Sequence, residues 1–335
     1  MTQLHRVAFA IVLCALALRA DDPAFTMRGV GARAMAMGNA YVALSNDFSA
    51  VYWNPAGLGY TPVREFQIGI EGIKLETGTT FGSVRDDIDK NRMRLSHAGT
   101  VQAIPASRGG FSFAIGFSSP VTFDNAYSFH GNDRLLGDAR IGYYWLYDDD
   151  GNQIPDTLRR GESLYYHDVT NTAYGQLRMI NLAAGWQVGP GLSFGFSVNP
   201  IFGKIHERLR IESFRKPDGD GLFQNSLETY TRSFSGIDMR LGMLFRPDER
   251  VSVGARLDLP QYLRMKMDYE LVDSTYDMVL DKSSDEITLS RPFTGAAGIA
   301  CMLPIGTMSV EATFRAPFFE AAEHSDQAYF RVGGS

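Results

Sequence analysis

Carboxylates that could hold a metal ion gather in one short segment of this chain. Residues 148–156 read DDDGNQIPD, and Asp148, Asp150, Asn152 and Asp156 are the candidate ligands. A calcium ion prefers several such oxygens on a tightly turning backbone, but the distal glutamate of an EF-hand is missing from its expected place. The segment therefore indicates either a loop that binds Ca²⁺ or a solvated acidic loop, and the second interpretation is favoured.

Two glycine patterns imitate catalytic or cofactor motifs. Residues 29–34 (GVGARA) match a dinucleotide fingerprint, which requires a preceding strand in a βαβ unit, and no such unit is expected here. Residues 191–195 (GLSFG) match a nucleophile elbow, but Ser193 falls inside an alternating segment typical of a strand. The six histidines form no closely spaced ligand pair. We therefore expect no catalytic residues, and we predict that the protein is not an enzyme.

The elements that must position these residues are β-strands. From Glu65 onward apolar and small or polar residues alternate with a period of two, as in Phe111 to Phe117 and Leu192 to Val198. This pattern predicts an all-β protein. The expected strands are residues 65–75, 92–104, 110–123, 140–147 with 174–188, 191–212, 228–246, 250–272, 285–303, 306–315 and one that begins near 327.

Alternation occurs in soluble sandwiches as well as in membrane barrels, and two details favour a transmembrane antiparallel β-barrel. Short turns near 189–191, 246–249 and 304–306 contrast with long polar segments near 124–140, 148–177 and 213–233, as in outer-membrane barrels. The less apolar face is rich in Gly, Ser and Ala, which suits a polar lumen, and it carries a few charges: Asp238, Arg240, Arg256, Asp258, Glu311 and Arg315. The net charge of −6 argues against a nucleic-acid partner.

The N-terminus predicts export. A weakly basic start, an apolar run from Val7 to Leu18 and small residues before Asp21 have the order of a secretory signal peptide, although a buried helix is the alternative. The expected organisation is a signal peptide at 1–20, an N-terminal segment at 21–62 and a barrel at 63–335. Because the last alternating run stops at Ser335 without a terminal aromatic residue, we expect the barrel to lack its final strands. The expected location is the bacterial outer membrane, with the lipid bilayer as partner.

Residues 29–58 differ from the strands that follow. They read GVGARAMAMGNAYVALSNDFSAVYWNPAGL, with an Asn-Pro-Ala core at 54–56 and an upstream Gly-Ala-Arg-Ala and Asp47. This segment resembles the N-terminal signature of the FadL-type transporters of hydrophobic compounds, and its YWNPAGL spelling is closer to the PorV-like proteins of type IX secretion. The resemblance implies a 14-stranded barrel with this segment folded into the lumen as a plug. A periplasmic tail that binds another protein is the alternative.

The resemblance also implies two functions. The first is passive passage of hydrophobic small molecules, such as long-chain fatty acids, across the outer membrane. The residues expected to act on the plug side are Phe48, Tyr52, Trp53, Asn54, Pro55 and Ala56. The second is a shuttle that holds cargo at the secretion machinery, which would make secretion or cargo proteins its partners. No cofactor is expected apart from Ca²⁺ in the acidic loop.

Overall fold

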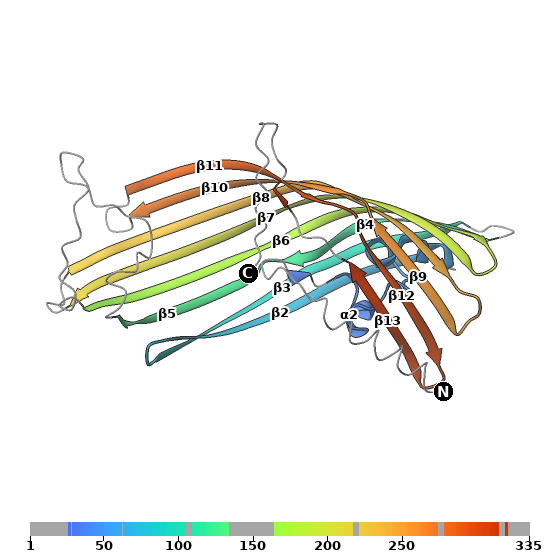
Figure 1. Cartoon of the computed structure of the whole chain (residues 1–335), viewed down its shortest axis with the longest axis horizontal. Helices are drawn as coiled ribbons and strands as arrows, with labels where there is room; N and C mark the ends of the chain where they lie inside the picture. The colour runs from blue at the N-terminus through green and yellow to red at the C-terminus, as the bar shows by residue number, and fades with distance from the viewer. Residues whose placement is uncertain are drawn as a thin grey trace.

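A computed structural model shows that the chain is nearly all β and that its antiparallel strands curl into a half-barrel (Figure 1). The structure describes residues 26–27, 29–61, 63–104, 109–133, 164–216, 221–273, 278–314 and 319–320. The expected signal peptide, the acidic loop at 148–156, and the strands expected at 140–147 and near 327 lie outside these residues. The predicted all-β, barrel-like fold is confirmed.

The described strands vary widely in length. Twelve have eight residues or more: β2 (Glu65–Phe81), β3 (Val84–Ile104), β4 (Gly110–Thr122), β5 (Asn125–Asp133), β6 (Leu164–Gly189), β7 (Leu192–Lys216), β8 (Gly221–Phe245), β9 (Val251–Asp258), β10 (Gln261–Asp273), β11 (Met278–Arg291), β12 (Thr294–Leu303) and β13 (Gly306–Phe314). Two have two residues each, β1 (Thr26–Met27) and β14 (Phe319–Glu320). The helices are the short α2 (Ala32–Ala36) and α3 (Ala50–Trp53) and the 3₁₀-helix η1 (Pro55–Tyr60).

One sheet contains all the strands, and its main path runs β13-β12-β9-β8-β7-β6-β4-β3-β2. The connections at 190–191, 246–250 and 304–305 are short and lie at one end of the sheet, which we call the turn end. Because strand directions alternate, the end of β5 and the start of β6, the end of β7 and the start of β8, and the end of β10 and the start of β11 lie at the opposite end of the sheet, which we call the loop end (Figure 1).

Two predicted strands are each interrupted. The expected strand at 250–272 breaks at Leu259-Pro260 into β9 and β10, and the one at 285–303 breaks at Pro292-Phe293 into β11 and β12. Proline supplies no N–H for a ladder, so a ladder is readily interrupted there. β9 and β10 both pair with β8, which shows that they continue one line.

Several expected loops are in fact strand. β6 begins at Leu164, β7 ends at Lys216 and β8 begins at Gly221, so most of 164–177 and 213–233 is paired backbone. These stretches carry many polar and charged residues, and that polarity led to their assignment as loops. Neighbouring strands still satisfy their backbone groups.

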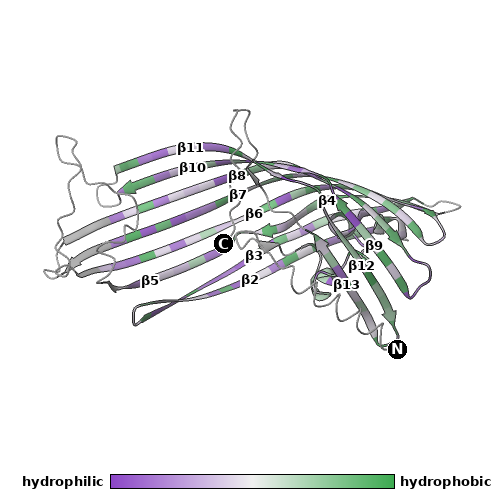
Figure 2. Ribbon diagram, in the orientation of Figure 1, coloured by the Kyte–Doolittle hydropathy of each residue, from purple (hydrophilic) through white to green (hydrophobic). Residues whose placement is uncertain are grey.

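The two faces of the sheet differ, and we define the inner face as the one that contacts residues 29–61. The opposite, outer face carries exposed apolar side chains near the turn end, where hydrophobic residues colour parts of the strands green (Figure 2). In one row Phe111, Trp186, Phe194 and Met243 lie opposite one another on β4, β6, β7 and β8. These four side chains are 39–59% exposed. We call this exposed surface the apolar band.

On β7 the apolar band extends from Leu192 to Phe202, and its outward positions carry no charge over this length. The outward residue that follows Phe202 on this strand is Lys204. The inner face behind and beyond the band belongs to a buried hydrophobic cluster that also includes residues of the N-terminal segment. Among the described residues, the helices are too short or too polar to cross a membrane.

Candidate functional site

The N-terminal segment, residues 29–61, lies against the inner face near the turn end and folds through three short helices (Figure 1). Gly31, which precedes α2, has φ 90°, a backbone conformation that glycine adopts without steric cost. Pro55 opens η1, where its fixed φ suits a first helical turn and its missing N–H is no loss. The sequence of residues 54–60 therefore favours a compact turn over a wall strand.

Asn54 connects this turn to the wall. Its side-chain nitrogen donates to the carbonyl oxygen of Val42 at 2.8 Å and to that of Met243 on β8 at 3.0 Å. Its side-chain oxygen accepts from the N–H of Ala56 at 3.1 Å. The residue is fully buried, so all three hydrogen bonds form away from water. Asn54 thus holds its own turn, the preceding part of the segment and the sheet together.

A row of glycines receives the turn on the wall side. Gly185 on β6 is opposite Gly195 on β7, which is opposite Gly242 on β8. A Cβ atom at any of the three would come within 2.5 Å of atoms in the turn that begins at Asn54. We call this row the glycine groove, because the missing side chains let two backbones approach closely.

A second pair of glycines receives the ring of Phe48. Gly99 on β3 is opposite Gly116 on β4, and a Cβ atom on either would come within 2.5 Å of a Phe48 ring carbon. The ring also lies nearly parallel to the imidazole of His97, with their centroids 6.2 Å apart. Phe48 is fully buried, so this contact fixes the far side of the segment to β3 and β4.

Arg240 on β8 binds the end of helix α3. One of its nitrogens donates to the carbonyl oxygen of Tyr52, and its guanidinium carbon lies 4.2 Å from the centroid of the Tyr52 ring. Its Nε donates to Asp238 at 2.7 Å, and Asp238 also accepts from Asn199 at 3.0 Å. The last carbonyls of a helix lack intrahelical partners, and a buried cation paired with a carboxylate satisfies one of them here.

Arg256 on β9 repeats this arrangement one strand further on. It donates to the carbonyl oxygen of Trp53 at 3.1 Å and forms an ion pair with Asp258 at 2.8 Å. Thr294 on β12 donates to the same carboxylate at 2.9 Å. Two arginines from adjacent strands therefore hold the C-terminal end of α3.

Further anchors hold the backbone of the segment elsewhere. Ser193 donates to the carbonyl oxygen of Ala56 at 2.7 Å, and Ser252 donates to that of Ala43 at 2.6 Å. Glu311 on β13 accepts from the N–H groups of Tyr41 and Val42 at 2.8 and 2.9 Å. The segment is thus bound across the half-barrel, from β3 to β13.

Hydrogen bonds inside the segment fix its shape. Asp47 accepts from the Tyr41 hydroxyl at 3.0 Å and from the backbone N–H of Ser49 at 2.9 Å. Burial, together with the Asp47 carboxylate, raises the pKa of the Tyr41 phenol, so Tyr41 remains a donor at neutral pH. The Trp53 indole donates to the carbonyl oxygen of Val30 at 2.7 Å.

The structure brings all six expected plug-side residues together on the inner face. Phe48, Tyr52, Trp53, Asn54, Pro55 and Ala56 are all buried. The prediction that Ser193 lies in a strand is confirmed, and its hydroxyl contacts Ala56. The GVGARA pattern follows β1, which pairs antiparallel with β4, so no βαβ unit surrounds it. The expected calcium ligands Asp148, Asp150, Asn152 and Asp156 lie outside the described residues.

Sequence reasoning missed the wall side of this contact. The inward charges Asp238, Arg240, Arg256 and Asp258 suggested a polar lumen, but they are buried beneath the segment, where two of them bind its backbone. The glycine groove was not recognised either, although its members occupy inward positions of alternating strands.

Within the part of the chain that the structure describes, no cluster of three or more His, Cys, Asp or Glu side chains could hold a metal ion. Comparison of the chain with protein-family models, with curated proteins and with solved structures found no match. Functional assignment therefore depends on the geometry described above.

Proposed function

We propose that the chain is an outer-membrane protein through which hydrophobic compounds, such as long-chain fatty acids, pass by diffusion. In this proposal the N-terminal segment is the plug, and the compounds pass around it. The observation that carries this proposal is that the apolar band lies directly behind the surface that holds the plug. Trp186 and Phe194 face outward next to Gly185 and Gly195, which face the plug.

The dimensions of the apolar band support a membrane location. A tilted transmembrane strand needs about 9–11 residues, which agrees with the uncharged run from Leu192 to Phe202 on β7. An exposed apolar surface of this extent is costly in water but stable against lipid. A closed β-barrel satisfies its backbone groups in a bilayer, and this curled antiparallel sheet has the form of part of such a wall.

The inner face beyond the plug supports a hydrophobic cargo. Porin lumens are polar. Here Leu177, Met179, Ile201, Ile205 and Phe234 face inward and belong to the same buried cluster as the plug. An acyl chain gains roughly 0.8 kcal/mol for each CH₂ group that it transfers from water to such surroundings. A path lined in this way would favour acyl chains over sugars or ions.

A break in the wall supports a sideways exit into the bilayer. β3 pairs with β4 only from His97 to Ile104, and the rest of β3 pairs only with β2 among the described strands. The line from β4 to β5 is itself interrupted at Phe123-Asp124, after a bulge between Ser118 and Val121. Cargo that passes the plug would meet a stretch of wall without a continuous hydrogen-bond ladder.

An uptake assay tests this proposal. Gram-negative cells that lack their own outer-membrane fatty-acid uptake would express the chain, and entry of radiolabelled oleate would be measured. Asn54→Ala combined with Pro55→Ala should impair uptake, because the turn loses its fixed geometry, while membrane extraction and circular dichroism show that the barrel is retained. Asn46→Ala serves as the control from the same segment.

Uptake by the double variant equal to that of the wild type would defeat the plug mechanism. Absence of uptake by the wild-type chain, combined with specific retention of a secreted cargo protein at the loop end, would favour the shuttle function instead.

A further inference from the structure

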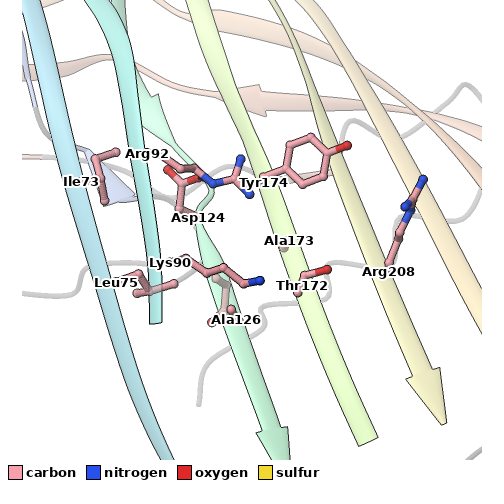
Figure 3. Close-up of a pocket in the computed structure, with 11 residues that line it drawn as sticks. Ile73, Leu75, Lys90, Arg92, Asp124, Ala126, Thr172, Ala173, Tyr174 and Arg208 are labelled. Carbon is pink, nitrogen blue, oxygen red and sulfur yellow. Dashed lines mark ion pairs between the residues drawn. The ribbon is translucent and has the colours of Figure 1, made fainter. Parts of the chain in front are cut away.

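A cavity outside the plug site lies between the β2–β3 hairpin and strands β5, β6 and β7. Its volume is about 140 Å³. Figure 3 shows Arg92 and Asp124 beside Tyr174, and Lys90 extending over Ala126. Apolar carbons of Ile73, Leu75 and Ala126 line one part of the cavity, and cations line the other.

Two of the cations in this cavity are free to bind a ligand. Asp124 is the acidic residue in its lining, and it is already engaged by Arg92 at 3.4 Å and by Arg94 at 3.5 Å. Among the described residues, Lys90 and Arg208 have no carboxylate within ion-pair distance. The cavity therefore offers positive charge that its own carboxylate does not neutralise, in a chain whose net charge is −6.

An aromatic ring fixes the third cation. The guanidinium of Arg92 lies 4.7 Å from the centroid of the Tyr174 ring, and the ring centroid of His206 lies 5.4 Å from that of Tyr174. A cation held over an aromatic face keeps its charge while its position is restricted. Arg92 is thus ordered before any ligand arrives.

The cavity lies against the outer face of β6 and β7, at the loop end of the apolar band, with the β2–β3 hairpin on its other side. Along β7 the alternation places Arg208 on the same face as Phe202, and Arg208 is opposite Thr172 on β6. Arg178 and Lys204, both exposed, occupy the outward positions between the band and the cavity. Positive charge therefore begins where the apolar surface ends, which is the level of lipid headgroups if the band spans a bilayer.

We propose that this cavity binds the phosphate of a membrane lipid whose headgroup carries a net negative charge. Lys90 and Arg208 contact the phosphate, Arg92 supports it, and Ile73, Leu75 and Ala126 receive the first carbons of the lipid. The inference rests on the proposed membrane location of the chain. Charge complementarity and continuity with the apolar band select a lipid over a water-soluble phosphate, because its acyl chains would continue along the band.

Lipid binding to the full chain in dodecyl maltoside micelles tests this site. Native mass spectrometry would compare retention of dioleoylphosphatidylglycerol with that of dioleoylphosphatidylcholine. Loss of each cation should weaken the preference for phosphatidylglycerol roughly fivefold, so K90Q/R208Q should lose roughly 25-fold. The control K74Q/R85Q removes one lysine and one arginine from the same hairpin, where both form exposed ion pairs away from the cavity, and it should bind like the wild type.

An unchanged preference in K90Q/R208Q, or an equal loss in both double variants, would overturn the site. Displacement of phosphatidylglycerol by oleate as effective as that by a short-chain phosphatidylglycerol would overturn the phosphate assignment. Flotation with phosphatidylcholine vesicles tests the membrane location separately. A chain that does not float defeats the proposed function, whereas a chain that floats but binds both lipids equally defeats only this inference.

Discussion

Replacing Asn54 with alanine should loosen the N-terminal segment from the wall without unfolding the sheet. The substitution removes three buried hydrogen bonds and leaves the carbonyls of Val42 and Met243 without that donor. A typical hydrogen bond contributes about 1 kcal/mol, and an unsatisfied buried group costs about 1–3 kcal/mol. We therefore expect the docked segment to lose about 3–5 kcal/mol of stability. This loss corresponds to roughly a hundredfold to a few thousandfold more frequent opening.

Hydrogen exchange followed by mass spectrometry measures this opening directly. Peptides that cover residues 42–58 should exchange faster in Asn54→Ala by that factor, while peptides from β6 and β7 keep their protection. Asn46→Ala is the matched control, because Asn46 accepts one side-chain hydrogen bond, from Arg33, at an exposed position. Its effect should stay below about 1 kcal/mol.

A third variant separates the donor role of Asn54 from its acceptor role. Asn54→Asp keeps an oxygen for the N–H of Ala56, but a carboxylate cannot donate to the carbonyls of Val42 and Met243. It should therefore open at least as often as Asn54→Ala. If Asn54→Ala exchanges like Asn46→Ala, or if Asn54→Asp exchanges like the wild type, Asn54 does not link the segment to the wall.

Three further perturbations test the wall. Gly195→Val places its Cβ atom inside the N-terminal segment, whereas a Cβ atom at Gly72 meets no atom within 4 Å, so Gly195→Val but not Gly72→Val should raise exchange in the segment. Equal exchange in both variants would contradict the glycine groove. Arg240→Gln breaks a buried ion pair and should lower the free energy of unfolding in detergent by about 3–5 kcal/mol, measured by chemical denaturation. A negligible loss would show that Arg240 does not hold the end of α3. Phe194→Arg should disfavour membrane insertion by about 2–4 kcal/mol, measured by vesicle flotation of refolded protein, whereas Thr231→Arg beyond the band should insert normally. Equal insertion of these two variants would show that the outer face does not contact lipid.

The fold class was predictable because one signal dominates it. The alternation along Phe111–Phe117 and Leu192–Val198 is a local pattern, and it can be recognised without knowing which strands pair with each other. The ends of the strands were less predictable. β7 continues through mainly polar residues to Lys216. It remains a strand there because it pairs with β8, and this pairing cannot be inferred from the sequence of one strand.

The breaks within strands were difficult to predict for the same reason, because they also depend on the surrounding sheet. Pro260 and Pro292 mark the interruptions, and each lies in an otherwise strand-like run. A proline at an edge or a bulge is compatible with an uninterrupted strand, so sequence alone does not decide between the two cases. Pro200 illustrates the point, because it lies inside β7 without ending it.

The inward charges were misinterpreted for a different physical reason. A lumen filled with water and a buried network of carboxylates, arginines and backbone carbonyls both select polar side chains at inward positions. Arg240 and Arg256 satisfy the second description, since each binds a carbonyl oxygen at the end of α3 and a carboxylate of the wall. What distinguishes the two cases is the partner, and that partner lies about 190–200 residues earlier in the chain.

The glycine groove shows where local reasoning had to stop. A two-residue turn at Pro190-Gly191 would by itself place Gly185 opposite Phe196, but a bulge between Gln187 and Gly189 shifts the register by one residue and places Gly185 opposite Gly195. Two glycines facing each other on the inward side indicate that another backbone approaches closely. Gly242 is different, because β7 and β8 are joined far from it, at the loop end. Its place opposite Gly195 is set by pairing along the whole length of the two strands. Neither pairing follows from a turn alone, so the width of a groove across three strands requires the sheet.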